Sequence, residues 1–296
     1  IYELPLVFEK QNLCEKILNK LNLRKKKNNL PEWEKFIKEV KKIKKKVKIG
    51  IVGKYFDIGA FKLFDSYISV IEAVKHAAWH NKVKPDIKWI DSKTFEKHPE
   101  KISMLKELDG IIVPGGFGLS GIEGKIATIK YARENNIPYL GLCLGMQLAV
   151  VEYARNVCGL EGANSAEIDK NTPHPVIDFI PEQIKFIRES RYGATMRLGA
   201  YPAVLKEGTL VRKLYGKKTV YERHRHRYEV NPKYVDLLEK NGIVFSGKSP
   251  DKVLMEFMEL PNHRFFVATQ AHPEFKSRPM KPSPPFDGLI KASIKK

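Results

Sequence analysis

Cysteine is scarce in this chain. Three cysteines, Cys14, Cys143 and Cys158, occur among 296 residues. An odd and sparse set of this kind provides no disulfide framework, and it is typical of proteins that stay in a reducing compartment. We therefore expect free thiols and a cytoplasmic location.

Long apolar runs are missing as well. The longest, Tyr139 to Val151, is interrupted by Gln147 and is too short to cross the apolar core of a bilayer. We find no signal-peptide pattern. An apolar fraction of 43% is ordinary for a soluble globular protein, and 296 residues can bury one large core or two smaller ones. The sequence predicts a soluble protein without a membrane partner.

Acidic residues are outnumbered, with 34 Asp and Glu against 53 Lys and Arg and a net charge of +19. Twelve of the basic residues lie between Arg24 and Lys48, where only three glutamates oppose them. A Lys-dominated run is more often a solvated linker face than a nucleic-acid-binding stripe. We predict no specific nucleic-acid partner, and a non-catalytic nucleic-acid-binding module that uses this segment remains an alternative from a different class of function.

The chain divides into three segments. Residues 1–23 read as a short extended piece, Ile1 to Leu6, followed by a small amphipathic helix. Residues 24–46 form a basic linker, whose second part from Leu30 to Lys46 predicts a connector helix with an apolar stripe. Residues 47–296 are expected to form the main domain.

Strands and helices alternate from Val47 onwards. This alternation predicts an α/β fold, with a mostly parallel central sheet covered by helices on both faces and with added β-strands in the C-terminal half. In sheets of this kind, sites form at the carboxyl ends of strands. The expected elements are strands or helices at Val47–Val52, Ser66–His80, Ile87–Ile90, Gly110–Val113, Glu123–Glu134, Tyr139–Leu142 and Leu144–Val157, then strands at Thr219–Val230, Ile243–Ser246, Val253–Leu260 and Phe265–Gln270.

Cys143 lies where the expected strand Tyr139–Leu142 gives way to the helix that begins at Leu144. A residue on such a sharp turn projects its side chain from the sheet edge, and Gly141 and Gly145 supply the room that the turn needs. The positive end of the helix dipole favours a thiolate there, and the N–H of Leu144 can donate to an oxyanion. Cysteine is also a common core residue, so a packed thiol remains the alternative until a partner base is found.

His272 and Glu274 offer that partner. Residues two apart on an extended chain point the same way, and Pro273 biases His272 toward that conformation. The carboxylate can then hold the imidazole in one tautomer. A nucleophile, a base and an orienting group would follow in the chain order Cys, His, Glu, although a His-Pro-Glu tripeptide alone is usually loop.

Two further segments indicate ligand contacts. The glycine-rich stretch Pro114 to Gly118 follows the strand Gly110–Val113, and it could bring backbone N–H groups close to a ligand, although it could also be a plain turn. The segment Glu222 to Val230 holds three arginines and two histidines. We expect an anionic ligand near it, with an exposed edge strand as the alternative.

With these elements read, the chain resembles the class I, triad-type glutamine amidotransferases, a family with a flavodoxin-like fold. Three stretches carry the resemblance: Gly141 to Gln147, Pro114 to Gly118 and Gln270 to Phe275. A finer resemblance, covering about Val47 to the end, is to the glutaminase half of the CTP synthase family, and it rests on the blocks at residues 163–167, 195–199, 222–231 and 277–284. Residues 1–23 resemble the tail of that family's preceding amidoligase domain.

The resemblance implies a catalytic role for each matching residue. Cys143 attacks the side-chain amide of glutamine, His272 carries the proton to the leaving ammonia, and Glu274 orients His272. A γ-glutamyl thioester forms and is hydrolysed to glutamate. The backbone N–H groups of Gly116 and Leu144 form the oxyanion hole.

It also implies the binding residues. Glu167 pairs with the substrate's ammonium and Arg227 with its carboxylate, while the turn of Leu144, Gly145, Met146 and Gln147 lines the pocket. Phe117 and Arg197 lie in the loops that match an allosteric GTP site. Two departures from the family pattern bear on this: Ala271 replaces the usual aromatic residue before the histidine, and paired glycines are missing before Thr195.

Glutamine hydrolysis in this family needs no cofactor and no metal. In the full-length enzyme, ATP and Mg²⁺ serve the amidoligase domain, which converts UTP to CTP in pyrimidine biosynthesis, GTP is an activator, and a homotetramer is implied. No ATP or UTP site is visible in this sequence, so this polypeptide alone is expected to release ammonia. The glutaminase subunit of another amidotransferase is the nearest alternative.

Overall fold

The computed structural model describes residues 1–26, 30–53, 67–116, 118–179 and 196–295. Its helices are α1 Leu4–Lys10, α2 Leu13–Lys20, α3 Leu30–Lys42, α4 Ile68–His80, α5 Lys93–Lys97, α6 Ile122–Glu134, α7 Leu144–Asn156, α9 Leu210–Tyr215, α10 Pro232–Lys240 and α11 Pro284–Ser293, with 3₁₀ turns η2 Pro99–Glu107 and η4 Pro273–Lys276. Its strands are β1 Lys46–Gly53, β2 Lys84–Asp91, β3 Gly110–Val113, β4 Tyr139–Leu142, β5 Asn164–Ser165, β6 Pro175–Phe179, β7 Arg197–Leu205, β8 Thr219–His226, β9 Tyr228–Val230, β10 Val244–Lys248, β11 Met255–Glu259 and β12 Phe266–Thr269.

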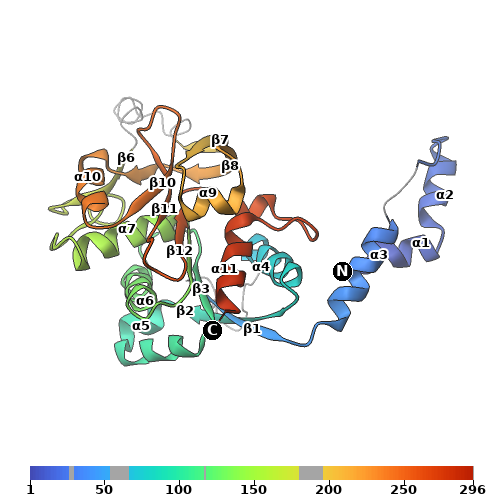
Figure 1. The fold of residues 1–296 in the computed structure, drawn as a ribbon, viewed down its shortest axis with the longest axis horizontal. Coiled ribbons are helices and arrows are strands. Elements are labelled where there is room, and N and C mark those ends of the chain that lie inside the picture. Colours follow the sequence, from blue (N-terminus) through green and yellow to red (C-terminus); the bar gives the residue numbers. More distant parts are fainter. Residues whose placement is uncertain (27–29, 54–66, 117, 180–195, 296) are drawn as a thin grey trace.

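A nine-stranded sheet in the order β2-β1-β3-β4-β12-β11-β10-β7-β8 forms the centre of the molecule (Figure 1). The strands from β2 to β12 in this order pair in parallel, whereas β12, β11, β10, β7 and β8 pair antiparallel. The parallel half has the strand order of flavodoxin-like folds, with β12 in the place of the fifth strand. The predicted fold class, a mostly parallel sheet with added strands from the C-terminal half, is confirmed.

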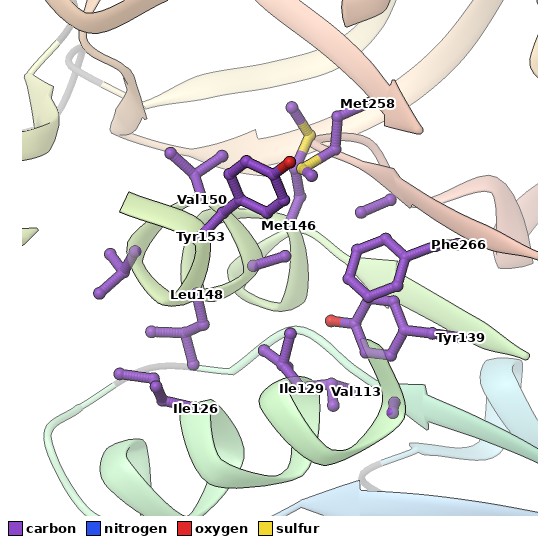
Figure 2. Packing of buried hydrophobic residues seen from close by; sticks show 14 of the residues in the cluster. Val113, Ile126, Ile129, Tyr139, Met146, Leu148, Val150, Tyr153, Met258 and Phe266 are labelled. Carbon is purple, nitrogen blue, oxygen red and sulfur yellow. The ribbon is translucent and has the colours of Figure 1, made fainter. Parts of the chain in front are cut away.

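Helices cover both faces of this sheet, and each face has its own core. On β3, Ile111 and Val113 pack in one buried cluster with α6 and α7, whereas Ile112 packs in the other with α4 and α11. This follows from the period of two along a strand, since the apolar run of β3 must supply both cores. Figure 2 shows the first cluster, where the rings of Tyr139 and Phe266 stack with centroids 4.4 Å apart.

The start of the chain differs from the sequence-based expectation. The extended piece expected at Ile1–Leu6 is wrong, because Leu4–Lys10 is the helix α1. Pro5 lies in the first turn of this helix, where a missing N–H costs nothing, and the carbonyl of Glu3 accepts from the N–H of Val7 at 3.1 Å. Tyr2, which precedes this helix, packs edge-on against Trp79 of α4, with ring centroids 4.8 Å apart, and so contacts the main domain.

The basic segment between Arg24 and Lys48 holds the connector helix that was expected. This helix, α3, ends at Lys42, and β1 begins at Lys46. The single strand expected at Thr219–Val230 is divided: β8 is an edge strand of the large sheet, and β9 joins β5 and β6 in a three-stranded sheet. Among the described residues, no helix combines the length and the apolar character that crossing a bilayer requires.

A buried ion pair ties α6 to α7, the helix that begins directly after Cys143. The guanidinium of Arg133 reaches Glu152, whose side chain has no exposed area, with the shortest contact 2.7 Å. The same guanidinium also contacts Glu134 at 3.3 Å, and that carboxylate is about half exposed.

We expect Arg133→Met to lower the free energy of unfolding by about 3 kcal/mol, because it leaves the carboxylate of Glu152 buried without its charge partner. Glu134→Gln, which removes the exposed partner of the same guanidinium, is the control and should change stability by less than about 0.5 kcal/mol. Urea unfolding at pH 7 measures both. Equal losses in the two variants would contradict the prediction.

Candidate active site

Cys143 occupies a strained turn between β4 and α7. Its φ of 51° and ψ of −102° lie outside the regions that non-glycine residues normally adopt, and the residue caps the N-terminus of α7. Gly145 explains how α7 can start so close to the sheet, because a Cβ there would lie 2.1 Å from the carbonyl oxygen of Val113. Sequence analysis placed the turn and assigned its two glycines correctly.

The strand β12 brings the far end of the chain to this turn. β12 runs parallel to β4 with Thr269 beside Leu142, and the N–H of Cys143 donates to the carbonyl of Thr269 at 2.7 Å. The next residues along the chain, Gln270 to His272, therefore leave the sheet at the carboxyl end where Cys143 lies.

His272 and Glu274 are joined by a hydrogen bond of 2.7 Å between Nδ1 and Oε1. The backbone differs from the extended form expected for it, because Pro273–Lys276 is a 3₁₀ turn. The N–H of His272 donates to the carbonyl of Arg223 in β8 at 2.7 Å, which fixes the start of that turn. The expected contact thus forms, but through a different local geometry.

The protonation of His272 follows from its surroundings. Burial alone would lower the pKa of His272, but hydrogen bonds to Cys143 and Glu274 and their charges outweigh burial and raise this pKa to about 10. The ring is therefore protonated at neutral pH, with Nδ1 directed to the carboxylate.

The sulfur of Cys143 lies where two cavities meet. The larger has a volume of about 270 Å³ and is lined by Gly115, Gly116, Arg225, His272 and Glu274 together with the start of α4. Gly115 lies beside both reactive groups, because a Cβ on it would lie 2.9 Å from Cε1 of His272 and 3.5 Å from Cβ of Cys143.

The smaller cavity, of about 40 Å³, holds most of the residues predicted to bind a zwitterion. Gly116, Leu144, Gln147, Glu167 and Arg227 line it beside Cys143. The structure thus places Glu167, Arg227, Gly116 and Leu144 around one cavity with Cys143.

Gly145 and Met146, which were also expected to line the pocket, lie differently. Gly145 packs against the backbone of β3, and the side chain of Met146 is buried in the apolar cluster of Figure 2. Neither residue is among those that line the smaller cavity.

Comparison with known proteins identifies the family. Residues 62–292 match the family described as Glutamine amidotransferase class-I. The chain belongs to the class I glutamine amidotransferases.

Individual relatives of this amidotransferase match nearly the whole of this chain. The chain is 56% identical over 299 residues to the CTP synthase of Methanocaldococcus jannaschii, a match that covers 99% of this chain and 54% of that protein. It is 56% identical over 292 residues to the CTP synthase of Sulfurisphaera tokodaii, covering 99% of this chain and 53% of that protein. The chain therefore spans about half the length of these curated relatives.

A solved structure is similar as well. The glutaminase domain of Trypanosoma brucei CTPS with bound acivicin superposes with a TM-score of 0.77 and 40% sequence identity. The match covers 84% of this chain and 94% of that domain. The amidotransferase fold and the finer resemblance seen in the sequence agree with these comparisons.

Arg197 of this amidotransferase is surrounded by buried acidic groups. Its guanidinium contacts Glu256 at 2.7 Å and Glu229 at 3.2 Å, and burial raises the pKa of both carboxyl groups. It also lies over the ring of Tyr201, 4.4 Å from the centroid. A GTP phosphate at this guanidinium would compete with two carboxylates. The GTP roles of Arg197 and Phe117 remain predictions, and Phe117 lies outside the described residues.

The histidines of β8 also face inward. Burial lowers the pKa of His224 to about 2 and that of His226 to about 3, so both rings are neutral at pH 7. On this edge strand the side chains alternate, with Arg223 and Arg225 exposed and the histidines buried. Of the basic residues in the segment, Arg225 lines the larger cavity beside Cys143, and His226 and Arg227 line the smaller one.

A third cavity lies away from Cys143. It measures about 800 Å³, and it is lined by α3 and by the end of α4 with Pro279 and Met280. None of the predicted site residues lines it. Within the described part of the chain, no group of three or more His, Cys, Asp or Glu side chains could hold a metal ion.

Sequence reasoning missed Gln270 as a site residue. Its side chain is fully buried, and its Nε2 lies 3.7 Å from Sγ of Cys143. The register of β12 on β4 places the two residues side by side. Because these strands are more than a hundred residues apart in sequence, no local pattern could have revealed the pair.

Proposed function

We propose that this chain hydrolyses L-glutamine to glutamate and ammonia through a thioester on Cys143. One observation supports this most strongly: Cys143, on its strained turn at a helix N-terminus, shares a cavity with the hydrogen-bonded pair of His272 and Glu274. This arrangement supplies a nucleophile, a proton carrier and an orienting carboxylate.

The first half-reaction forms the thioester. The thiolate of Cys143 attacks the side-chain carbonyl carbon of glutamine, and the carbonyl oxygen becomes an oxyanion. The N–H groups of Gly116 and Leu144 are proposed to stabilise that charge, because both residues line the smaller cavity next to the sulfur. The proton on Nε2 of His272 passes to the amide nitrogen, the carbon–nitrogen bond breaks, and ammonia leaves.

The second half-reaction restores the enzyme. His272, now neutral, takes a proton from a water molecule as the water attacks the thioester carbon. The bond from carbon to sulfur breaks, glutamate is released, and the protonated ring again faces the thiolate. Glu274 stabilises the imidazolium at both stages through its contact with Nδ1.

The smaller cavity fits the head group of an amino acid. Glu167 is proposed to bind the α-ammonium and Arg227 the α-carboxylate, with Leu144 and Gln147 along the wall. The Nε atom of Arg227 is buried and has no hydrogen-bond partner among the described residues. A substrate carboxylate would supply that partner.

The role within a longer protein is also a proposal, and it rests on the relatives being CTP synthases about twice as long as this chain. The ammonia would serve the ATP- and Mg²⁺-dependent amination of UTP to CTP by a preceding amidoligase domain, with GTP as activator and a homotetramer as the assembly. Residues 1–23 would be the tail of that domain, residues 24–46 the connector, and residues 47–296 the glutaminase domain. The free cysteines fit a cytoplasmic location.

The test is labelling by a glutamine analogue that carries a diazoketone, together with glutamate release. We expect a single adduct on the peptide that contains Cys143, loss of glutamine hydrolysis in proportion to labelling, and protection by glutamine. Cys143→Ala is the control, which should neither be labelled at this peptide nor release glutamate. A label on Cys14 or Cys158, with hydrolysis unchanged, would overturn the proposed function.

A further inference from the structure

Gln270 contacts the reacting sulfur, although the two half-reactions above give it no part. Its Nε2 lies 3.7 Å from Sγ of Cys143, a distance at which an amide can donate to sulfur. The side chain has no exposed area, and the backbone N–H of Gln270 donates to the carbonyl of Glu256 at 3.0 Å. The backbone of Gln270 is therefore fixed by its hydrogen bond to β11, and its side chain is enclosed by protein.

The direction of the Gln270 amide is fixed by its neighbours. The carbonyl oxygen of Tyr228 can only accept a hydrogen bond, so Gln147, whose amide lies 2.9 Å from it, must present its NH₂ group there. The same NH₂ group lies 3.3 Å from the other glutamine and requires an acceptor, which is Oε1 of Gln270. The NH₂ group of Gln270 is then the one that faces Sγ.

The carbonyl of Tyr228 is held by a second buried donor. Nδ1 of His226 lies 3.2 Å from it, so this nitrogen carries the proton of the neutral ring. The bare Nε2 of His226 accepts from Nδ1 of His224 at 2.9 Å. The two buried histidines of β8 thus hold the carbonyl of Tyr228 in place. That carbonyl in turn fixes the orientation of the Gln147 and Gln270 side chains.

We propose that Gln270 is a further catalytic residue, whose side-chain amide donates a hydrogen bond to the thiolate of Cys143 and holds the sulfur in its attacking position. This inference rests on the proposed function, since it assumes that Cys143 is the nucleophile. A donor to a thiolate stabilises the charged form and makes it available at neutral pH. It also restricts rotation of the Cys143 side chain, which keeps the sulfur directed at the junction of the two cavities.

The test measures alkylation of Cys143 by iodoacetamide as a function of pH, with the modified peptide quantified by mass spectrometry. Gln270→Met keeps the length of the side chain and removes the donor. We expect its alkylation rate at pH 7 to fall about tenfold, since a hydrogen bond to a charged group is lost, and its rate at pH 10 to stay within about twofold of the unaltered chain. The exposed Cys14 in the same sample provides the reference rate of an ordinary thiol.

A second variant and a core control separate this role from a merely structural one. Gln270→Glu keeps the shape and the acceptor for Gln147 but places an oxygen against the sulfur, so at least the same tenfold loss at pH 7 is expected even if the methionine variant does not fold. Ile129→Ala removes a buried side chain of α6, labelled in Figure 2, that lines neither cavity beside Cys143, and it should lower the melting temperature without changing the pH profile.

Alkylation of both Gln270 variants at the unaltered rate at pH 7 would overturn the inference and leave the proposed function standing. If Cys143 in the unaltered chain reacts no faster than Cys14 at pH 7, the proposed function itself fails. The two failures are therefore distinguishable in one experiment.

Discussion

Glutamate release by the His272→Asn variant is expected to fall by about a thousandfold or more, with the Michaelis constant for glutamine nearly unchanged. Asparagine occupies a similar volume and can keep a hydrogen bond to Glu274, but it cannot pass a proton to the leaving ammonia. The glutamine head group is proposed to bind in the cavity of Glu167 and Arg227, which His272 does not line, and that cavity is left intact. Steady-state kinetics with a glutamate assay measure both parameters.

The same substitution should slow the alkylation of Cys143. Because the pKa of His272 is about 10, the ring is charged from neutral pH up to about that value, and its positive charge favours a negative charge on the neighbouring sulfur. We expect iodoacetamide to alkylate Cys143 more slowly at pH 8 in His272→Asn than in the unaltered chain, with the rate of Cys14 unchanged between the two samples. A variant that keeps a tenth of the activity and the unaltered alkylation rate would contradict the assigned role.

The sign of the linked stability change follows from the same pKa. The folded-state pKa of His272 is raised above its ordinary value of 6.5, so the stabilisation is fully present below about pH 6.5 and is lost as pH rises toward 10. His272→Asn should therefore be less stable than the unaltered chain at pH 6, and this difference should shrink by pH 10. Urea unfolding at the two pH values measures it.

Gly145→Ala is expected to have the second of the two largest effects. The added Cβ would lie 2.1 Å from the carbonyl oxygen of Val113, a backbone atom at the end of β3, and β3 is held by pairing with β1 and β4 on its two sides. The first turn of α7 would have to shift away from β3, and Cys143 would shift with it. We expect a loss of about 3 kcal/mol in unfolding free energy and at least a hundredfold lower activity per folded molecule.

Gly159→Ala is the matched control for this prediction. Gly159 has a φ of 69°, and a Cβ there would meet nothing within 4 Å. The control therefore carries the cost of a left-handed residue, about 1 kcal/mol, without a steric clash at the active site. Its activity should be unchanged. If Gly145→Ala behaved like Gly159→Ala in both measurements, the close approach of α7 to β3 would not be what positions Cys143.

The parts of the fold that sequence reasoning predicted correctly are those with a local signature. The Tyr139–Leu142 strand, the turn at Cys143 and the helix after it are contiguous, and each is marked by apolar spacing or by glycine. The strands β3 and β12 are likewise short apolar runs in their own right. Such features depend on neighbours in the sequence and can be read directly.

The parts that were missed depend on contacts between distant segments. The register of β12 on β4 places Gln270 beside Cys143, and nothing near either residue encodes that pairing. The division of Thr219–Val230 into β8 and β9 likewise depends on which sheet each half meets. The segment at Ile1–Leu6 was expected to be extended, but Pro5 is suited to the first turn of the helix that the structure has there.

Cys143 lines both the larger and the smaller cavity, and this bears on how the two products of the proposed reaction leave. The acyl group, tethered to Cys143, would remain anchored in the small chamber by the charges of Glu167 and Arg227. The departing nitrogen carries no such anchor and can leave through the roomier chamber on the side of His272. The two products would therefore leave by different cavities, with ammonia first, because the acyl group stays bound to Cys143 until water cleaves the thioester.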